Sequence, residues 1–397
     1  MASNGYSGNS GYAAFGREAD GAKGVPVAAT HFVPLQEESL TTELNTNGDS
    51  LVFGSKGARL LTTAGTRSHG GDITVMAEPT STALLFDALL PRTSIANIGS
   101  GFYQWNFNST SWSATGSYTV DISKGGVSVS RFAGLMISEI SPSWSDGRQY
   151  WKAKASALKA FHSAVIASQT TTTLTLDTTN NPRPTELLRT GDTVGIRHAN
   201  GSTENGTIAS LTTTTVVLAT APGTTAAGDV LYIRPATPTL EDLRPFLWET
   251  TEFRFGADAA TALTATHIPV EDGSEYSISH QFEDDKGAQS SGSFDPSLLV
   301  RSKTIDATAK TKEYYESDAI AAQYSALPKR ALVIRSFSEG QCEVRITLNN
   351  LTNTKGGDKP SLKADEALYY EREYQPNYDR TDGQMLAVAV INKLASA

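Results

Sequence analysis

A Thr-rich stretch at 161–235 contains the same strand pattern twice, and this feature most limits how the chain can fold. About a quarter of the stretch is Thr, and it has no Lys. Residues 166–176 and 208–218 share the order Ile-Ala-Ser, a run of Thr and an alternating Leu/Val segment, and Gly191-Asp192 recurs as Gly228-Asp229. β-Branched alternation between Gly-Asp and Asn-Gly turns is typical of strands and hairpins. We therefore predict an inserted β-domain, a small barrel or sandwich made of two similar halves.

The rest of the chain shows one order of elements twice. Without the insert, about 320 residues remain, enough for two units of ordinary domain size. Each unit is predicted to contain a strand, a polar Gly/Ser-rich loop, a second strand, one helix and then long strands. In the first unit these are Glu37–Leu44, a loop from Asn45, Asp72–Met76 and Thr80–Leu90; in the second they are Tyr276–His280, Glu283–Asp295, Arg301–Asp306 and Glu313–Leu327.

Proline marks both predicted helices. Pro79 suits the first turn of the first helix, whose Leu84, Leu85, Ala88 and Leu89 form one apolar stripe. Each helix is then terminated by proline, at Pro91 and Pro328 respectively. The long strands that close the units are Tyr118–Ile122, Val127–Glu139, Gln149–Ala155, Ala331–Ser336, Cys342–Leu348, Ala367–Tyr374 and Met385–Asn392.

These patterns predict a mainly β protein, with an antiparallel β-sandwich or barrel and a flanking helix, duplicated in the chain, plus the small inserted β-domain. The predicted divisions are a flexible N-terminal arm at 1–11, a first unit at 12–160, the insert at 161–235 and a second unit at 236–397. The arm is Ser/Asn/Gly-rich without a basic start or apolar centre, which does not suit a signal peptide.

Charge and hydropathy narrow the classes of partner. The formal net charge is −9 and no run of Lys or Arg occurs, so tight binding to nucleic acid is not expected, because phosphate neutralisation supplies most non-specific affinity. An acidic wall can still let DNA slide past as cargo. No segment approaches the ~20 apolar residues that cross a bilayer. We expect a soluble protein made in the cytoplasm, with no membrane partner.

A search for reactive groups predicts no catalytic, cofactor-binding or metal site. The single Cys342 excludes an intramolecular disulfide and is expected to be a strand residue. The six histidines show no ligand spacing, and Glu283-Asp284-Asp285 lacks the spacing of an EF-hand loop. No nucleophile elbow, Walker loop or dinucleotide fingerprint occurs. The five tryptophans are expected in the core or at interfaces.

The opening residues resemble those of a known family. Tyr12–Glu18, Gly24–Ala28 and Phe32–Leu40 are similar to the start of tailed-phage tail tube (major tail) proteins, which show a Gly-Glu start, a Gly-Thr-x-x-x-Pro step and a Glu-Ser-Leu strand. Gly24-Val25 stands here in place of the usual Gly-Thr. Further segments resemble the family in the same order, across about 320 residues outside the insert: Gly70–Ile73, Ser117–Val120, Phe132–Ile137 and Pro245–Trp248.

The resemblance implies a structural virion protein. Its tube domains would have two packed antiparallel sheets and one helix, join edge to edge into rings, and stack into a hollow tube that delivers genome DNA into the host. It implies no catalytic residues and no cofactor, location in the virion tail after assembly in the host cytoplasm, and a largely acidic lumen with DNA as non-specific cargo. The implied partners are further copies of the chain and the terminator, tape measure and distal tail proteins.

The resemblance also suggests assembly surfaces. Asn45–Leu60 would contact the adjacent ring, and Glu283–Asp295 would do the same in the second unit. Met1–Gly11 would form a further arm between rings or subunits, and the insert would project outward, away from the DNA. The candidate residues for contact between rings are Asn45, Asn47, Asp49, Ser55, Lys56, Arg59, Asp284, Asp285 and Lys286.

Several alternatives stay open at this level. Three chains with two units each would make a ring trimer of pseudo-six-fold symmetry, whereas a hexamer would use six whole chains. A phage adhesin or decoration protein would bind carbohydrate or capsid through the insert, although the insert has only Phe161 and Tyr232 as aromatic residues. A glycan hydrolase or lyase would need two carboxylates ~5–10 Å apart in a cleft.

Overall fold

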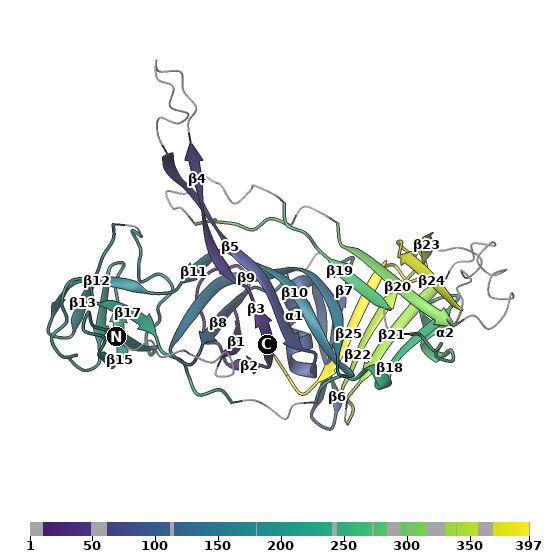
Figure 1. The fold of residues 1–397 in the computed structure, drawn as a ribbon. Helices are drawn as coiled ribbons and strands as arrows, with labels where there is room; N and C mark the ends of the chain where they lie inside the picture. The colour runs from purple at the N-terminus through teal and green to yellow at the C-terminus, as the bar shows by residue number, and fades with distance from the viewer. Residues whose placement is uncertain are drawn as a thin grey trace, which may run out of the picture.

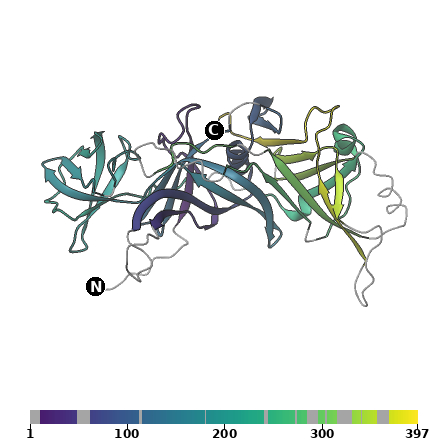
Figure 2. The same cartoon turned by 90° about the horizontal axis from the view of Figure 1, so that it is seen from above.

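The chain is mainly β and almost wholly antiparallel. The structure, a computed structural model, describes residues 11–48, 62–111, 115–179, 181–239, 244–271, 274–283, 295–301, 304–314, 330–338, 340–355 and 368–396. Figure 1 shows three parts in a row: a small barrel at one end, a central body around one helix, and a sheet of C-terminal strands at the other end. The same order is seen from above in Figure 2.

The Thr-rich insert folds as a closed six-stranded barrel. Its strands pair in the cycle β12–β13–β16–β15–β14–β17 and back to β12. Ile166 and Ile208 occupy equivalent places, because each begins a bulge in its strand and each amide donates to a Gly-Asp carbonyl, that of Asp229 or Asp192. The predicted small β-domain of two similar halves is confirmed. Its strands are β12 (Ala164–Thr170), β13 (Thr173–Leu176), β14 (Thr193–Arg197), β15 (Thr203–Leu211), β16 (Thr215–Leu218) and β17 (Val230–Ile233).

A long sheet, here called the spanning sheet, crosses the central body and continues into the C-terminal part. Its strands are β3 (Leu35–Glu38), β4 (Thr41–Gly48), β5 (Thr62–Met76), β10 (Arg148–Ala157), β9 (Ser128–Ser145), β19 (Glu275–Ser279), β20 (Asp306–Tyr314), β24 (Tyr369–Gln375) and β23 (Thr352–Lys355). The pairings β4–β5–β10–β9 in the first half are matched by β19–β20–β24–β23 in the second. The two sets join where Ile140 of β9 pairs with Ile278 of β19.

Two further sheets cover the body. One contains β2 (His31–Val33), β1 (Tyr12–Arg17), β8 (Tyr118–Lys124), the first half of β9, and β11 (Lys159–Phe161). The other contains β18 (Thr251–Gly256), β21 (Ala331–Phe337), β22 (Glu343–Leu348), β25 (Leu386–Asn392), β7 (Phe102–Asn108) and β6 (Arg92–Gly99). In this second sheet the last strand of the chain pairs with β7 from the first half, so the two halves are interleaved.

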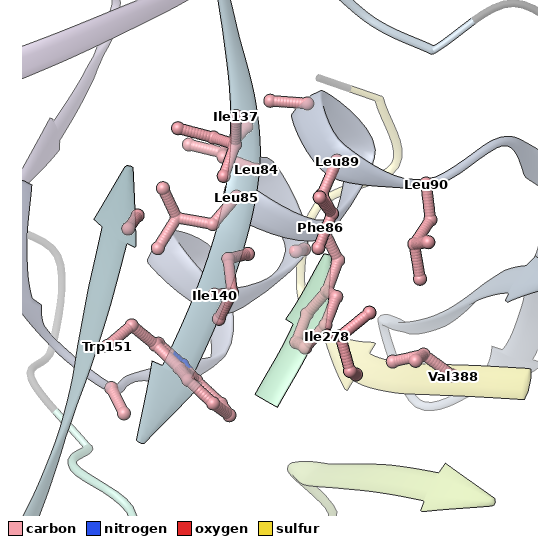
Figure 3. Close-up of a cluster of buried hydrophobic side chains, with 14 of the residues drawn as sticks. Leu84, Leu85, Phe86, Leu89, Leu90, Ile137, Ile140, Trp151, Ile278 and Val388 are labelled. Carbon is pink, nitrogen blue, oxygen red and sulfur yellow. The ribbon is translucent and has the colours of Figure 1, made fainter. Parts of the chain in front are cut away.

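The helix α1 (Pro79–Leu89) is the centre of the body. Pro79 stands in the first turn, and the Glu78 carboxylate accepts hydrogen bonds from the Thr80 and Ser81 amides, which caps the helix. Every residue of α1 is buried. Figure 3 shows Leu84, Leu85 and Phe86 against Ile137, Ile140 and Trp151, with Ile278 and Val388 beside Phe86. The predicted helix is confirmed to within one residue, and it packs on elements from both halves.

Four of the segments that resemble the tail tube family meet at one buried carboxylate. Glu18 accepts hydrogen bonds from the Gly24 amide at 2.7 Å and the Gly134 amide at 2.7 Å. It also accepts from the hydroxyls of Ser117 at 2.9 Å and Thr119 at 3.0 Å. Four donors satisfy one carboxylate that is 1% exposed. These motif residues therefore hold the N-terminal segment against β8 and β9.

The second half departs from the sequence expectations in one strand and in its helices. Among the described residues of the predicted strand Arg301–Asp306, only Asp306 lies in a strand, because the alternating residues that face the core begin at Ala307 in β20. Glu313 and Tyr314, predicted to start a helix, end β20 instead, and the rest of that helix lies outside the described residues. Two short helical segments were not anticipated, η2 (Trp248–Thr250) and α2 (Ala259–Thr264).

Candidate assembly surfaces

The outward face of the spanning sheet is a broad polar surface. Alternate residues of β10 point into the core, where Trp151, Ala153 and Ala155 are buried, so that Lys152 and Lys154 face solvent. β20 and β24 alternate in the same way and expose Lys310 and Glu371. The face is built by strands from both halves of the chain.

Two hollows lie side by side on this face. The first has a volume of about 500 Å³ and lies over β3, β5, β9 and β10, with Glu37, Asp72 and Glu139 at its wall. The second has a volume of about 570 Å³ and lies over β9, β19, β20 and β24. Lys152 and Ser141 line both. The two hollows therefore follow the sheet across the join between the halves.

Charges on this face alternate from strand to strand. Lys154 is in register with Asp72 on one side and Glu139 on the other. In the second half, Lys310 is in register with Glu275 and Glu373. Opposite charges on directly facing residues stabilise a sheet by a few tenths to about 1 kcal/mol per pair. The face thus carries rows of both signs, whereas the resemblance implies a largely acidic lumen.

The separation of the carboxylates on this face is relevant to the alternative of a glycan hydrolase or lyase. Asp72 and Glu139 lie on strands two apart, which corresponds to roughly 10 Å between backbones. The strand between them places Lys154 in register with both. Among the described residues, no group of three or more His, Cys, Asp or Glu side chains is placed to hold a metal ion.

A long hairpin is the second candidate surface. In Figure 1, β4 and the first part of β5 stand out from the body as a two-stranded ribbon. Asn45 and Asn47, expected in a loop, belong to β4, because pairing with β5 continues through Gly48. The Asn45 side chain is exposed and donates to Thr66 Oγ1 at 3.5 Å. Asp49, Ser55, Lys56, Arg59, Asp284, Asp285 and Lys286 lie outside the described residues.

The base of this hairpin contains a hydrogen-bonded row of side chains. The Thr42 hydroxyl of β4 lies 2.9 Å from His69 Nδ1 and 3.1 Å from His162 Nε2. His69 Nε2 contacts Asp295 at 3.2 Å. Burial alone would raise the pKa of Asp295, but the hydrogen bond and charge of His69 and the charge of Arg67 lower it. The row therefore joins the hairpin, the start of the insert and the second half.

The barrel is attached to the body at two points on β9. Phe161 of β11 pairs with Arg131 and Ile233 of β17 pairs with Val129, so both ends of the insert lie along one strand. The Arg131 guanidinium donates hydrogen bonds to the Asp121 carboxylate from Nε and Nη2, and to the Asp192 carboxylate of the barrel from Nη1. Burial alone would lower the pKa of Arg131, but Asp121 and Asp192 raise it, so the group stays charged.

Two free sheet edges complete the candidate surfaces. In the spanning sheet, the described part of the chain places no strand beyond β3 and β4 at one edge or beyond β23 at the other. Such edges present unpaired backbone groups to a further strand. Sequence reasoning missed these edges and the lysines of the polar face. The alternation Trp151-Lys152-Ala153-Lys154-Ala155 did indicate which side chains face solvent, but not that β9 pairs with a strand of the second half.

Cys342 and the tryptophans follow the sequence expectations in part. Cys342 lies one residue before β22, not inside a strand, and its burial raises the pKa of the thiol. Trp105 and Trp151 are fully buried, and Trp144 stacks edge-on against Trp248 with ring centres 4.8 Å apart. Among the described residues, no helix is long and apolar enough to cross a membrane.

Comparison with known proteins adds no relative. No family model matches the chain, and no curated protein matches it.

Proposed function

We propose that this protein is a structural subunit of a phage tail tube, assembling into stacked rings around a conduit for DNA. The observation that carries the proposal is the repeated pairing order in the spanning sheet. β4–β5–β10–β9 and β19–β20–β24–β23 are successive four-stranded sets, joined within the chain where β9 meets β19.

The same junction can be repeated between chains. In the order of strands within the two sets, β23 occupies the place of β9, and β4 occupies the place of β19. An antiparallel contact between β23 of one chain and β4 of the next would continue the sheet, and closure of the ring would remove both free edges. Because each chain supplies two such sets, we favour a ring of three chains with pseudo-six-fold symmetry over a ring of six chains.

The polar face supports the assignment of this sheet to the lumen. It has small hydroxyl side chains such as Ser141, Ser143 and Ser277, and two of its lysines, Lys154 and Lys310, are in register with carboxylates on both sides. Phosphate groups would find few uncompensated cations there, so DNA would pass without being held. Terminator, tape measure and distal tail proteins would be the partners at the tube ends.

The alternative is an adhesin or decoration protein that binds carbohydrate or capsid through the barrel. One observation favours it: the barrel is a closed module at one end of the molecule (Figure 1). This reading requires a stable monomer or a small closed oligomer.

Electron microscopy of the purified chain over a range of concentrations tests the proposal. Hollow stacked rings with three-fold end-on averages are the expected result. Six-fold averages would keep the tube but replace the trimer by a hexamer. Compact particles without a lumen at every concentration would reject the tube and favour the binding module.

A further inference from the structure

A pocket at the junction of the two halves lies beside the C-terminal end of α1. Its volume is about 560 Å³. Lys23, Pro91 and residues 109–111 line it from the first half, and Arg301 and Tyr378 line it from the second. No acidic side chain is among the described residues at its wall.

Arg301 carries a positive charge at this pocket without a carboxylate partner in the described part of the chain. Its guanidinium donates to the carbonyl oxygens of Ala88 at 2.7 Å and Ile137 at 2.5 Å, and to that of His280. The bond to Ala88 caps the end of α1, where partial negative charge accumulates, and the other two join Arg301 to β9 and to the residue after β19. The Nε atom is enclosed and has no hydrogen-bond partner among the described residues. Burial accordingly lowers the pKa of Arg301.

Lys23 adds a second cation at the same wall. Its ammonium donates to the Met136 sulfur at 3.4 Å, a weak acceptor. Burial and the charge of Arg301 lower the pKa of Lys23, and the nearby Asp20 and Glu18 offset this only in part. His280, also at the wall, is neutral at pH 7, because burial and Arg301 lower its pKa to about 4.

We propose that this pocket is a binding site for an oxyanion, a phosphate or a carboxylate, held between Lys23 and Arg301. Arg301 has no carboxylate partner among the described residues, and Asp20 and Glu18 offset the burial of Lys23 only in part. Burying such cations is costly, and an oxyanion would compensate both through charge-assisted hydrogen bonds. The hydroxyls of Ser109, Thr110, Thr115 and Thr304 at the wall offer neutral donors for the remaining oxygen atoms. The site does not depend on the tube proposal, since it lies within one chain.

A purely structural role for Arg301 gives a different expectation. If it only caps α1, added oxyanions will not stabilise the protein more than chloride at equal ionic strength. Lys23 separates the two readings, because it does not bond to the end of α1 in the described contacts. Its replacement should leave the cap intact and weaken the anion site.

The test uses the full, unassembled chain with sodium phosphate, sodium acetate or sodium chloride at matched ionic strength. Thermal unfolding and titration calorimetry measure binding by the native chain and by Lys23→Gln, with Lys152→Gln, an exposed lysine on the polar face, as the control. A ligand that binds only the native state raises the unfolding temperature as its concentration exceeds Kd. We expect a single saturable site whose Kd rises at least tenfold in Lys23→Gln and is unchanged in Lys152→Gln.

The ligands distinguish the two sources of oxyanion. Binding of phosphate supports a site for free phosphate. Binding of acetate without phosphate supports a site for a carboxylate group of a protein partner. If neither anion acts differently from chloride, or if Lys23→Gln binds as tightly as the native chain, the proposal is overturned. Arg301→Lys provides a second variant that retains the charge, and it should bind more weakly while it remains folded.

Discussion

Arg131 of β9 and Asp192 of the barrel form an ion pair that is almost completely enclosed, with side chains 2% and 7% exposed. Asp192 and Asp229 stand at equivalent places in the two halves of the barrel, and each accepts a hydrogen bond at 2.8 Å from the amide three residues before it. Their other partners differ. Asp192 holds Arg131 of the body, whereas Asp229 lies 2.8 Å from His198 of the barrel itself. The equivalent Gly-Asp carboxylates of the two halves thus bind different partners, Asp192 the body and Asp229 the barrel itself.

Replacement of Arg131 by Lys should therefore weaken the attachment of the barrel. A lysine ammonium cannot donate to Asp121 and Asp192 at the same time, as the planar guanidinium does. One buried carboxylate would therefore lose its cation. Breaking a buried pair typically costs about 3–5 kcal/mol, and we expect a loss in the lower part of this range because one charge is kept. Urea unfolding measures the loss. Arg189→Lys, at the more exposed partner of Asp192, is the control; an equal loss in both variants would contradict the assignment.

Removal of the barrel should leave the body folded and able to associate. Phe161 and Ile233 pair with β9 residues two apart, so the gap is roughly 7 Å along the strand and three residues can bridge it. We expect the chain with Gly-Ser-Gly in place of residues 162–232 to unfold cooperatively, with some loss of stability because Val129 and Ala133 become exposed. Under the proposed function it still forms rings by electron microscopy. Loss of rings from a folded variant would place the barrel in the assembly contact.

Substitution of Thr354 by Pro tests the free edge at β23. Thr354 lies in the irregular step of the β23–β24 register, where no Cα partner is assigned to it, and its hydroxyl donates to Glu373 O at 3.2 Å. Proline is tolerated at bulges and edges but removes an N–H donor. We expect the unfolding free energy to change by less than about 1 kcal/mol, while self-association measured by sedimentation is lost. Thr354→Ala removes the same hydroxyl but keeps the N–H, and it should still associate.

Glu18 should be among the carboxylates most sensitive to substitution. Glu18→Gln replaces one acceptor oxygen by an NH2 group that faces hydrogen-bond donors. Each hydrogen bond to a charged group contributes about 1.5–3 kcal/mol, so we expect a loss of at least about 3 kcal/mol by chemical denaturation. Asp20→Asn, at a carboxylate that is 68% exposed and pairs with Arg17, should cost under about 1 kcal/mol. A loss for Glu18→Gln no larger than for Asp20→Asn would show that the four contacts do not hold the N-terminal segment.

His280 gives a pH dependence with a defined sign. Burial and the charge of Arg301 lower the pKa of His280 to about 4, below the roughly 6.5 of an unfolded chain. Between these two pH values the unfolded state binds more protons than the folded state. The contribution of His280 to the unfolding free energy is therefore complete above about pH 6.5 and decreases as the pH falls toward 4. His280→Asn should flatten this part of the profile, whereas the exposed His267→Asn should not. A native profile that rises as the pH falls through this window would contradict the assignment.

The sequence by itself determined the local elements of this protein. The repeat in 161–235 indicated a small β-barrel or sandwich of two similar halves, because β-branched alternation and Gly-Asp turns act over a few residues. Pro79 and the Leu84/Leu85/Ala88/Leu89 stripe likewise placed α1 to within one residue. The sequence predicts a loop at Asn45 and Asn47, because this part of β4 has no apolar alternation.

Only the tertiary structure decided which strands meet. The pairs β9–β19 and β25–β7 join residues more than a hundred positions apart, and no local pattern selects one partner strand over another. The same holds for Arg131 with Asp192 and for the pocket between Lys23 and Arg301. Charged side chains at such places look like ordinary surface residues in the sequence. Their burial follows from the packing of the whole chain, which fixes the distances on which their electrostatic energies depend.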